Sequence, residues 1–180
     1  MDPFALLGLP KRPLISDEEI GTAYRKLAAT LHPDQAGGDE VRFKELAAAA
    51  AILRDPARRL RALIDLPPGS DIPPQAANLF PSVATLLREA GDLLDRHATA
   101  GNPLAKAVLA TPLKKLAADL DLLLTTIAAW RSDLDARLAA LDAAWPPQDP
   151  EDVAALADSF SYATRWESQL REKKLSLECL

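Results

Sequence analysis

The fold of the first third of this 180-residue chain is decided by the stretch Ser16-Asp17-Glu18-Glu19-Ile20-Gly21-Thr22-Ala23-Tyr24-Arg25-Lys26-Leu27-Ala28-Ala29-Thr30-Leu31-His32-Pro33-Asp34. Ser16 is followed three residues later by Glu19, the spacing of a capping box, in which each side chain accepts a bond from the other residue's backbone N–H. A helix is therefore expected to begin near Ser16. Pro33 disfavours helical backbone at the residue before it, so this helix should end at or just before His32.

Apolar side chains recur at intervals of three and four residues along this helix, which places them on one stripe. They are Ile20, Tyr24, Leu27, Ala28 and Leu31. Arg25 and Lys26 project from the other side. One face of the helix is thus predicted to pack, and the other is predicted to be cationic.

A second helix is expected after the Gly37-Gly38 turn, beginning at Asp39. Its apolar positions alternate with charged ones, as in a helix that buries one face. The apolar positions are Val41, Leu46, Ala50 and Leu53. The two helices are predicted to form an antiparallel hairpin with a short connecting loop.

Five segments resemble, in order and spacing, the elements of the J-domain family of co-chaperones. They are Phe4–Leu9 in the first short helix, Tyr24–Ala28 in the second helix, His32-Pro33-Asp34 in the loop, Phe43–Leu46 with Leu53, Asp55 and Pro56 in the third helix, and Arg58-Arg59 at the start of the fourth. The resemblance covers roughly residues 1 to 65. It implies docking onto a DnaK-type ATPase chaperone and stimulation of its ATP hydrolysis. The implied chaperone-binding residues are His32, Pro33, Asp34, Tyr24, Arg25 and Lys26.

Composition suits a soluble globular protein, with 48% hydrophobic residues, 26% charged residues and a formal net charge of -5. An acidic pI near 5.1 argues against general nucleic-acid binding. The single Cys179 excludes an internal disulfide, and no His or Cys pair near it suggests a zinc site. We see no apolar run long enough to cross a membrane and no secretory signal. A cytoplasmic location without membrane or nucleic-acid partners is expected.

A proline-rich stretch, Leu66-Pro67-Pro68-Gly69-Ser70-Asp71-Ile72-Pro73-Pro74, marks a boundary, because prolines remove backbone donors and fix backbone angles. Beyond it, helical periodicity returns. Helices are expected over 82–99, 103–110, from Pro112 to about Trp145, and from Asp149 to between Leu170 and Lys174. The sequence therefore predicts an all-α protein with a J-domain at 1–66, a linker at 67–81 and an antiparallel three-helix bundle at 82–176.

A narrower resemblance, to the HscB-type co-chaperones of iron-sulfur cluster assembly, rests on Gly8-Leu9-Pro10, on Asp55–Leu66 and on Leu86-Leu87-Arg88-Glu89. It implies that the bundle binds the scaffold protein on which iron-sulfur clusters are built. The implied client-binding residues are Leu79, Phe80, Val83, Leu86, Leu87 and Glu89. Two alternatives stay open: a J-domain protein with a different client, and a J-like interaction module that stimulates no ATPase.

Enzymatic chemistry is not predicted for this chain. His32 and Asp34 are separated by a rigid proline, which holds their side chains apart, and a catalytic pair would need a pocket and a third polar group. We therefore expect no catalytic residue, no metal site and no cofactor.

Overall fold

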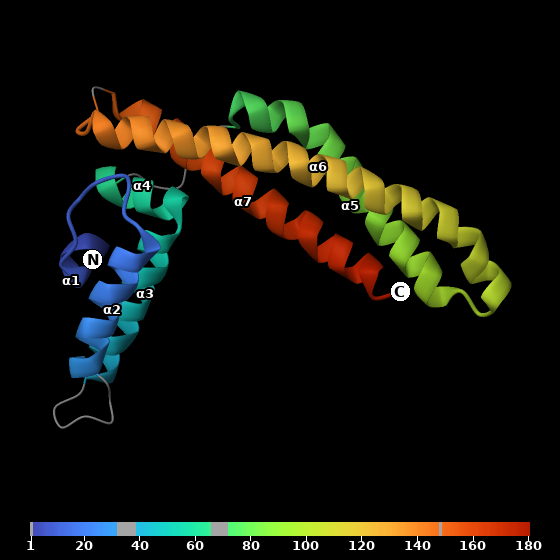
Figure 1. Cartoon of the computed structure of the whole chain (residues 1–180), viewed down its shortest axis with the longest axis horizontal. Helices are drawn as coiled ribbons and strands as arrows, with labels where there is room; N and C mark the ends of the chain where they lie inside the picture. Colours follow the sequence, from blue (N-terminus) through green and yellow to red (C-terminus); the bar gives the residue numbers. More distant parts are fainter. Residues whose placement is uncertain (1, 32–38, 66–71, 148) are drawn as a thin grey trace. The chain divides into compact units, whose positions relative to one another are not determined.

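A computed structural model describes residues 2–31, 39–65, 72–147 and 149–180 of the chain. Within these ranges the chain is helical without strands, which confirms the predicted all-α class. The helices are α1 (Pro3–Leu7), α2 (Asp17–Leu31), α3 (Glu40–Arg54), α4 (Pro56–Ile64), α5 (Pro74–Thr99), α6 (Pro103–Ala143) and α7 (Pro150–Glu178) (Figure 1).

Contacts divide the chain into two compact units. The first unit combines the described part of residues 1–71 with Leu134–Phe160, and the second combines Ile72–Asp133 with Ser161–Leu180. The long helices α6 and α7 therefore contribute to both units. The predicted domain boundaries, 1–66, 67–81 and 82–176, stay a prediction.

In the first unit, α2 and α3 lie side by side as a hairpin and α1 packs on α3 (Figure 1). Their shared core is made of large apolar side chains and two alanines. It comprises Phe4, Leu7, Ile15, Ile20, Leu46, Ala49, Ala50 and Leu53. The predicted stripe of α2 packs on this core, with Ile20 fully buried and the other members partly buried. Val41, predicted as an apolar packing position of α3, is 67% exposed, because it lies five residues before Leu46, the first buried residue of α3, and so points away from the buried stripe.

Among the described residues of this unit, two charged side chains are buried: Arg59 of α4 and Asp158 of α7. Arg59 of α4 is 4% exposed, and its Nε donates to the carbonyl of Pro13 at 2.7 Å. Its Nη1 donates to the carbonyl of Leu53 at 2.5 Å. Arg59 thus ties the loop before α2 and the end of α3 to the first turn of α4.

The ends of α6 and α7 belong to this first unit through polar contacts. The backbone N–H of Leu14 donates to Asp142 Oδ1 of α6 at 2.9 Å. Arg61 of α4 forms an ion pair with Asp158 of α7, and both side chains are mostly buried. Segments far apart in the sequence therefore hold the unit together.

In the second unit, α5 and the remaining parts of α6 and α7 share an apolar core. Its buried members include Ala76, Val83, Ala90, Leu116, Leu120, Leu123, Ile127, Trp130, Ala163, Trp166 and Leu170. The indole rings of Trp130 and Trp166 are 6.2 Å apart between centroids. Both tryptophans therefore belong to the packing between helices.

Helix boundaries in this region differ from those expected. The sequence predicts a first helix from 82 and a break before Pro112, whereas α5 begins at Pro74 and α6 continues through Pro112. Pro81 and Pro112 lie inside their helices, and buried residues on both sides of each proline hold the helices together despite the missing N–H. α7 also runs further than expected, to Glu178.

Candidate functional site

The capping box that begins α2 is present as predicted. The backbone N–H and the hydroxyl of Ser16 each donate to Glu19 Oε2 at 2.8 Å, and the Glu19 N–H donates to Ser16 Oγ at 3.1 Å. The two bonds from Ser16 lower the pKa of the Glu19 carboxyl. The start of α2, and hence the direction of its side chains, is set by this local network.

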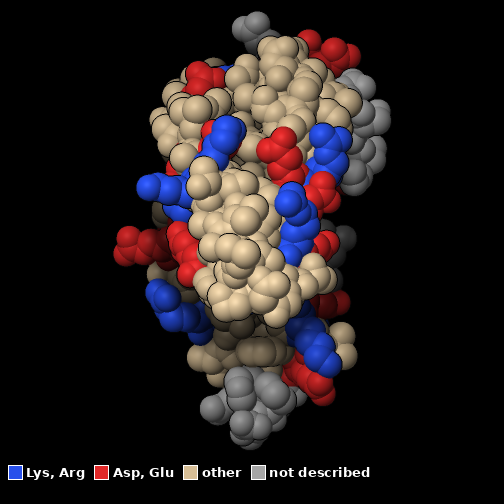
Figure 2. All heavy atoms as spheres, turned by 90° about the vertical axis from the view of Figure 1, so that its right-hand side faces the viewer, with Lys and Arg blue, Asp and Glu red and all other residues tan. Residues whose placement is uncertain are grey.

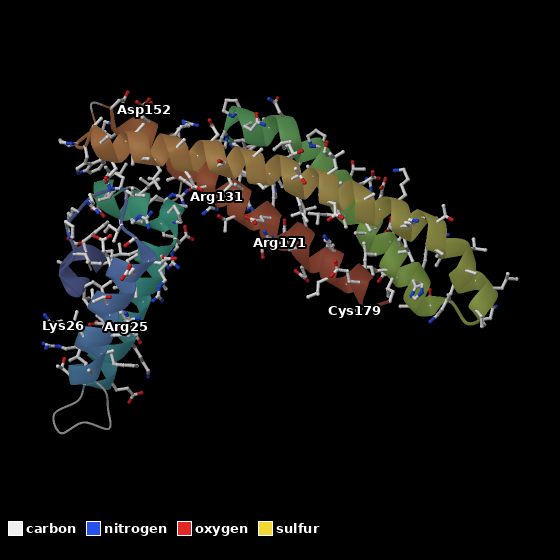
Figure 3. All side chains as sticks on the ribbon, in the orientation of Figure 1. Arg25, Lys26, Arg131, Asp152, Arg171 and Cys179 are labelled. Carbon is white, nitrogen blue, oxygen red and sulfur yellow. The ribbon has the colours of Figure 1, made fainter. Side chains whose placement is uncertain are left out.

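The cationic face of α2 is exposed, and we define it here as Arg25 and Lys26, labelled in Figure 3. The Arg25 guanidinium donates to Thr22 Oγ1 at 3.2 Å, one turn earlier on the helix. Its Nη1 would lie 3.4 Å from a Cβ added at Gly21, so the Arg25 head folds back over the glycine.

Tyr24 lies differently from its two neighbours. Its ring is 6.5 Å from that of Phe43 on α3, centroid to centroid, and the side chain is half-buried. Tyr24 therefore helps hold α2 against α3. Only the exposed part of the Tyr24 side chain is available for contact with another protein.

The loop residues His32, Pro33 and Asp34 lie outside the described residues. α2 ends at Leu31, immediately before His32, as predicted from Pro33. The N–H of Asp39 donates to the carbonyl of Leu31 at 3.1 Å, which brings the end of α2 to the start of α3. The Asp39 side chain then caps α3 by accepting from the N–H groups of Val41 and Arg42 at 3.0 and 3.1 Å.

A groove between α5 and α6 in the second unit has a volume of about 600 Å³, and we call it the α5–α6 groove. Its lining is mainly apolar with two acids, and consists of Leu79, Pro81, Ser82, Thr85, Leu86, Glu89, Asp119, Leu122, Leu123 and Thr126. Leu122 is 70% exposed. Lys115 donates to Asp119 at 2.5 Å, and this bond raises the pKa of the lysine.

The structure brings three of the six predicted client-binding residues, Leu79, Leu86 and Glu89, into this groove. The side chain of Phe80 is exposed beside it and its ring is 6.5 Å from that of Trp166. Leu87 is half-buried outside the lining.

Val83 is misplaced in the predicted client-binding set. It is 2% exposed and takes part in the packing between helices, so its side chain offers no surface to a client in this structure. Val83 was included because of the resemblance to the HscB-type co-chaperones, and a resemblance in sequence does not say which neighbouring helix covers a side chain.

Sequence reasoning missed the α6 side of this groove. Leu122, Leu123 and Thr126 come from α6, whereas the predicted client-binding residues all lie between Leu79 and Glu89. A signal existed in the run Leu122-Leu123-Leu124, because three successive leucines point in different directions around a helix and one helix seam cannot bury all of them.

On the face shown in Figure 2, Lys and Arg side chains are interspersed with Asp and Glu side chains, and neither sign forms a continuous patch. Among the described residues, no group of three His, Cys, Asp or Glu side chains is placed to hold a metal ion. No helix in the described parts of the chain is long and apolar enough to cross a membrane.

Comparison with known proteins adds one family match. The family model described as DnaJ domain matches residues 2–61. Chaperone protein DnaJ of Chlamydia pneumoniae is 48% identical over 62 residues, which cover 33% of this chain and 15% of that protein. A DnaJ homolog subfamily C member 7 homolog of Schizosaccharomyces pombe is 44% identical over 75 residues, 39% of this chain and 15% of that protein.

Chaperone protein DnaJ of Deinococcus proteolyticus is 44% identical over 61 residues, 32% of this chain and 19% of that protein. The chain thus spans less than a fifth of the length of these three relatives. No solved structure matches it.

Proposed function

We infer, from the DnaJ domain that residues 2–61 of this chain form, that the protein is a J-domain co-chaperone. It docks onto a DnaK-type ATPase chaperone and stimulates ATP hydrolysis by that partner, without being an enzyme itself. Its α5–α6 groove holds the client that is passed to the chaperone. The observation that carries the proposal is the exposed cationic face of α2, which leads directly into His32-Pro33-Asp34.

The electrostatics of α2 support docking of an acidic partner surface. The helix carries acids in its first turn, where they interact favourably with the helix dipole, and cations in its second half. Arg25 and Lys26 are exposed, and exposed charge pairs contribute only about 0–1 kcal/mol each and weaken with salt. Binding to the chaperone through this face is therefore expected to be transient and to weaken as the salt concentration rises.

Single-turnover ATP hydrolysis by a DnaK-type chaperone, with and without this protein, tests the first half of the proposal. Wild type should accelerate hydrolysis, Asp34→Asn should abolish the acceleration, and Lys26→Glu should weaken it most at low salt. Lys106→Glu, the same charge change at an exposed position of α6, is the matched control and should leave stimulation unchanged. A chain that never accelerates hydrolysis would instead be a J-like interaction module.

For the client, we propose an iron-sulfur cluster scaffold protein. Support comes from the HscB-like segments of the sequence and from the α5–α6 groove. Its exposed Leu122 and half-buried Leu79 and Leu86 offer apolar contact, and Glu89 and Asp119 offer acidic contact. The groove gathers residues from two helices, so it presents a shaped surface to a partner. A cytoplasmic location fits this assignment.

Binding of a purified scaffold protein, measured by isothermal titration calorimetry, tests the client assignment. Leu79→Ser and Leu122→Ser should each weaken binding by about tenfold, because each removes an apolar contact. Val108→Ser, at a position 66% exposed on α6 but outside the groove, should bind like wild type. If ATPase stimulation is normal but no scaffold binds, the protein serves a different client.

A further inference from the structure

A second hollow surface lies on α6 and α7, apart from the α5–α6 groove, and we call it the α6–α7 trough. It consists of two adjoining hollows of about 690 and 370 Å³ that share Asp121, Lys174 and Glu178. All of its lining residues belong to the second unit. The trough is therefore a feature of one compact body.

The helix surfaces that line the trough are partly apolar and partly small. α6 contributes Leu124, Ala117 and Ala128, and α7 contributes Leu175, which is 61% exposed. Alanines on α6 leave room for another helix to approach closely. The trough thus offers small and apolar side chains to an approaching helix.

The end of α7 lacks cover on this side. Leu170 is the last buried residue of the helix, yet α7 continues to Glu178 with no buried side chain among its last eight residues. Most helical stability in proteins comes from packing of an apolar face. The last two turns of α7 therefore expose Leu175 and gain little stability from packing within the chain. A partner that packs on these turns would supply the missing contacts.

Charges along the trough indicate which partner fits. Arg171, Lys174 and Glu178 follow each other on one stripe of α7, at spacings of three and four residues. Within the chain, Lys174 Nζ lies 2.5 Å from Asp121 Oδ1, and Arg171 Nη2 lies 2.6 Å from Glu167 Oε1. A two-fold axis near Lys174 would bring Arg171 of one copy opposite the partner's Glu178, so the pattern is complementary to itself.

We propose that a second copy of this chain packs on the α6–α7 trough, with two-fold symmetry about the region of Lys174. In this dimer the leucines of α7 are covered by the partner's α6 and α7, and Arg171 pairs with the partner's Glu178. Two-fold pairing of identical surfaces is the commonest form of association among soluble proteins. The α5–α6 groove is left open to a client.

Sedimentation equilibrium of the full chain at concentrations up to about 100 µM tests the dimer, since a micromolar Kd would then give a mainly dimeric population. Wild type should associate to a dimer. Leu175→Lys should raise the Kd at least about tenfold, because it replaces an exposed leucine that the dimer would bury with a charged side chain. Leu122→Lys, the same change at a more exposed leucine of the other groove, should leave the Kd unchanged.

Charge reversal tests the orientation of the two copies. Arg171→Glu and Glu178→Arg should each raise the Kd, because each places like charges opposite one another. The double variant should recover most of the lost affinity. Circular dichroism shows whether each variant is folded. A wild type that stays monomeric throughout, a Leu175→Lys variant that dimerises normally, or a double variant weaker than both single ones would overturn the proposal.

Discussion

Arg59 shows how much one side chain can decide in a small helical unit. Its guanidinium is almost wholly buried and donates to two backbone carbonyls, those of Pro13 and Leu53. Burial lowers the pKa of Arg59, while the carboxylates of Asp17, Asp55 and Asp142 favour its charged form. The charge is thus stabilised by acids from three different parts of the first unit.

Replacing Arg59 by Met should lower the free energy of unfolding by about 2–4 kcal/mol, because two carbonyls lose their donor inside the protein. Urea denaturation followed by circular dichroism measures this loss. Arg58→Met, at an exposed neighbour, should change stability by less than about 0.5 kcal/mol. Equal effects of the two substitutions would contradict the role assigned to Arg59.

At the scale of the element, α2 is defined by signals within a few residues of its ends. The capping box sets its first turn, Pro33 limits its last, and a stripe of apolar residues turns one face onto the core. The cationic face is the remainder of the same helix. The direction in which Arg25 and Lys26 point therefore depends on where α2 begins and on which side chains it buries.

Ser16→Ala should destabilise the first unit by about 1 kcal/mol at neutral pH, the usual cost of losing an N-cap side chain. The pKa of Glu19 is lowered from 4.5 in the folded protein, so its bonds stabilise the fold above pH 4.5 and this contribution is lost as pH falls through the folded-state pKa. The difference between wild type and Ser16→Ala should consequently shrink in acid.

Urea denaturation at a series of pH values measures this effect. Thr30→Ala in the same helix is the control, because its hydroxyl donates to the Leu27 carbonyl and bonds no carboxylate. The gap between wild type and Thr30→Ala should not change with pH. A Ser16→Ala gap that stays constant from neutral to acid pH would show that Glu19 takes no part in the cap.

At the scale of the whole molecule, the first unit is assembled from segments distant in the sequence. Arg61 and Asp158 are 97 residues apart, yet their ion pair joins α4 to α7 inside that unit. Leu14 and Asp142 are 128 residues apart and share a hydrogen bond. A fragment that ends after α4 would lack both contacts.

Asp158→Asn should destabilise the first unit by about 1–3 kcal/mol, because the charge of Arg61 loses its mostly buried partner. Hydrogen exchange of α4, read by mass spectrometry, should accelerate in this variant. Glu172→Gln, at an exposed acid further along α7, should leave α4 exchange unchanged. In a double-mutant cycle with Arg61→Gln, the two changes should be non-additive by more than about 0.5 kcal/mol; strict additivity would show that the pair contributes nothing.

Local patterns in the sequence determined the all-α class and the bounds of α2, because caps, prolines and periodicity act over a few neighbouring positions. The resemblance of the first segments to the J-domain family agrees with the DnaJ domain model that matches residues 2–61. Only the tertiary structure decided the burial of Arg59 and Val83, the continuation of α6 through Pro112, and the joining of Leu134–Phe160 to the first unit. Each of these depends on which surfaces meet across the fold. The free energy of such contacts depends on residues that are far apart in the sequence, and local patterns do not specify which distant segments come together.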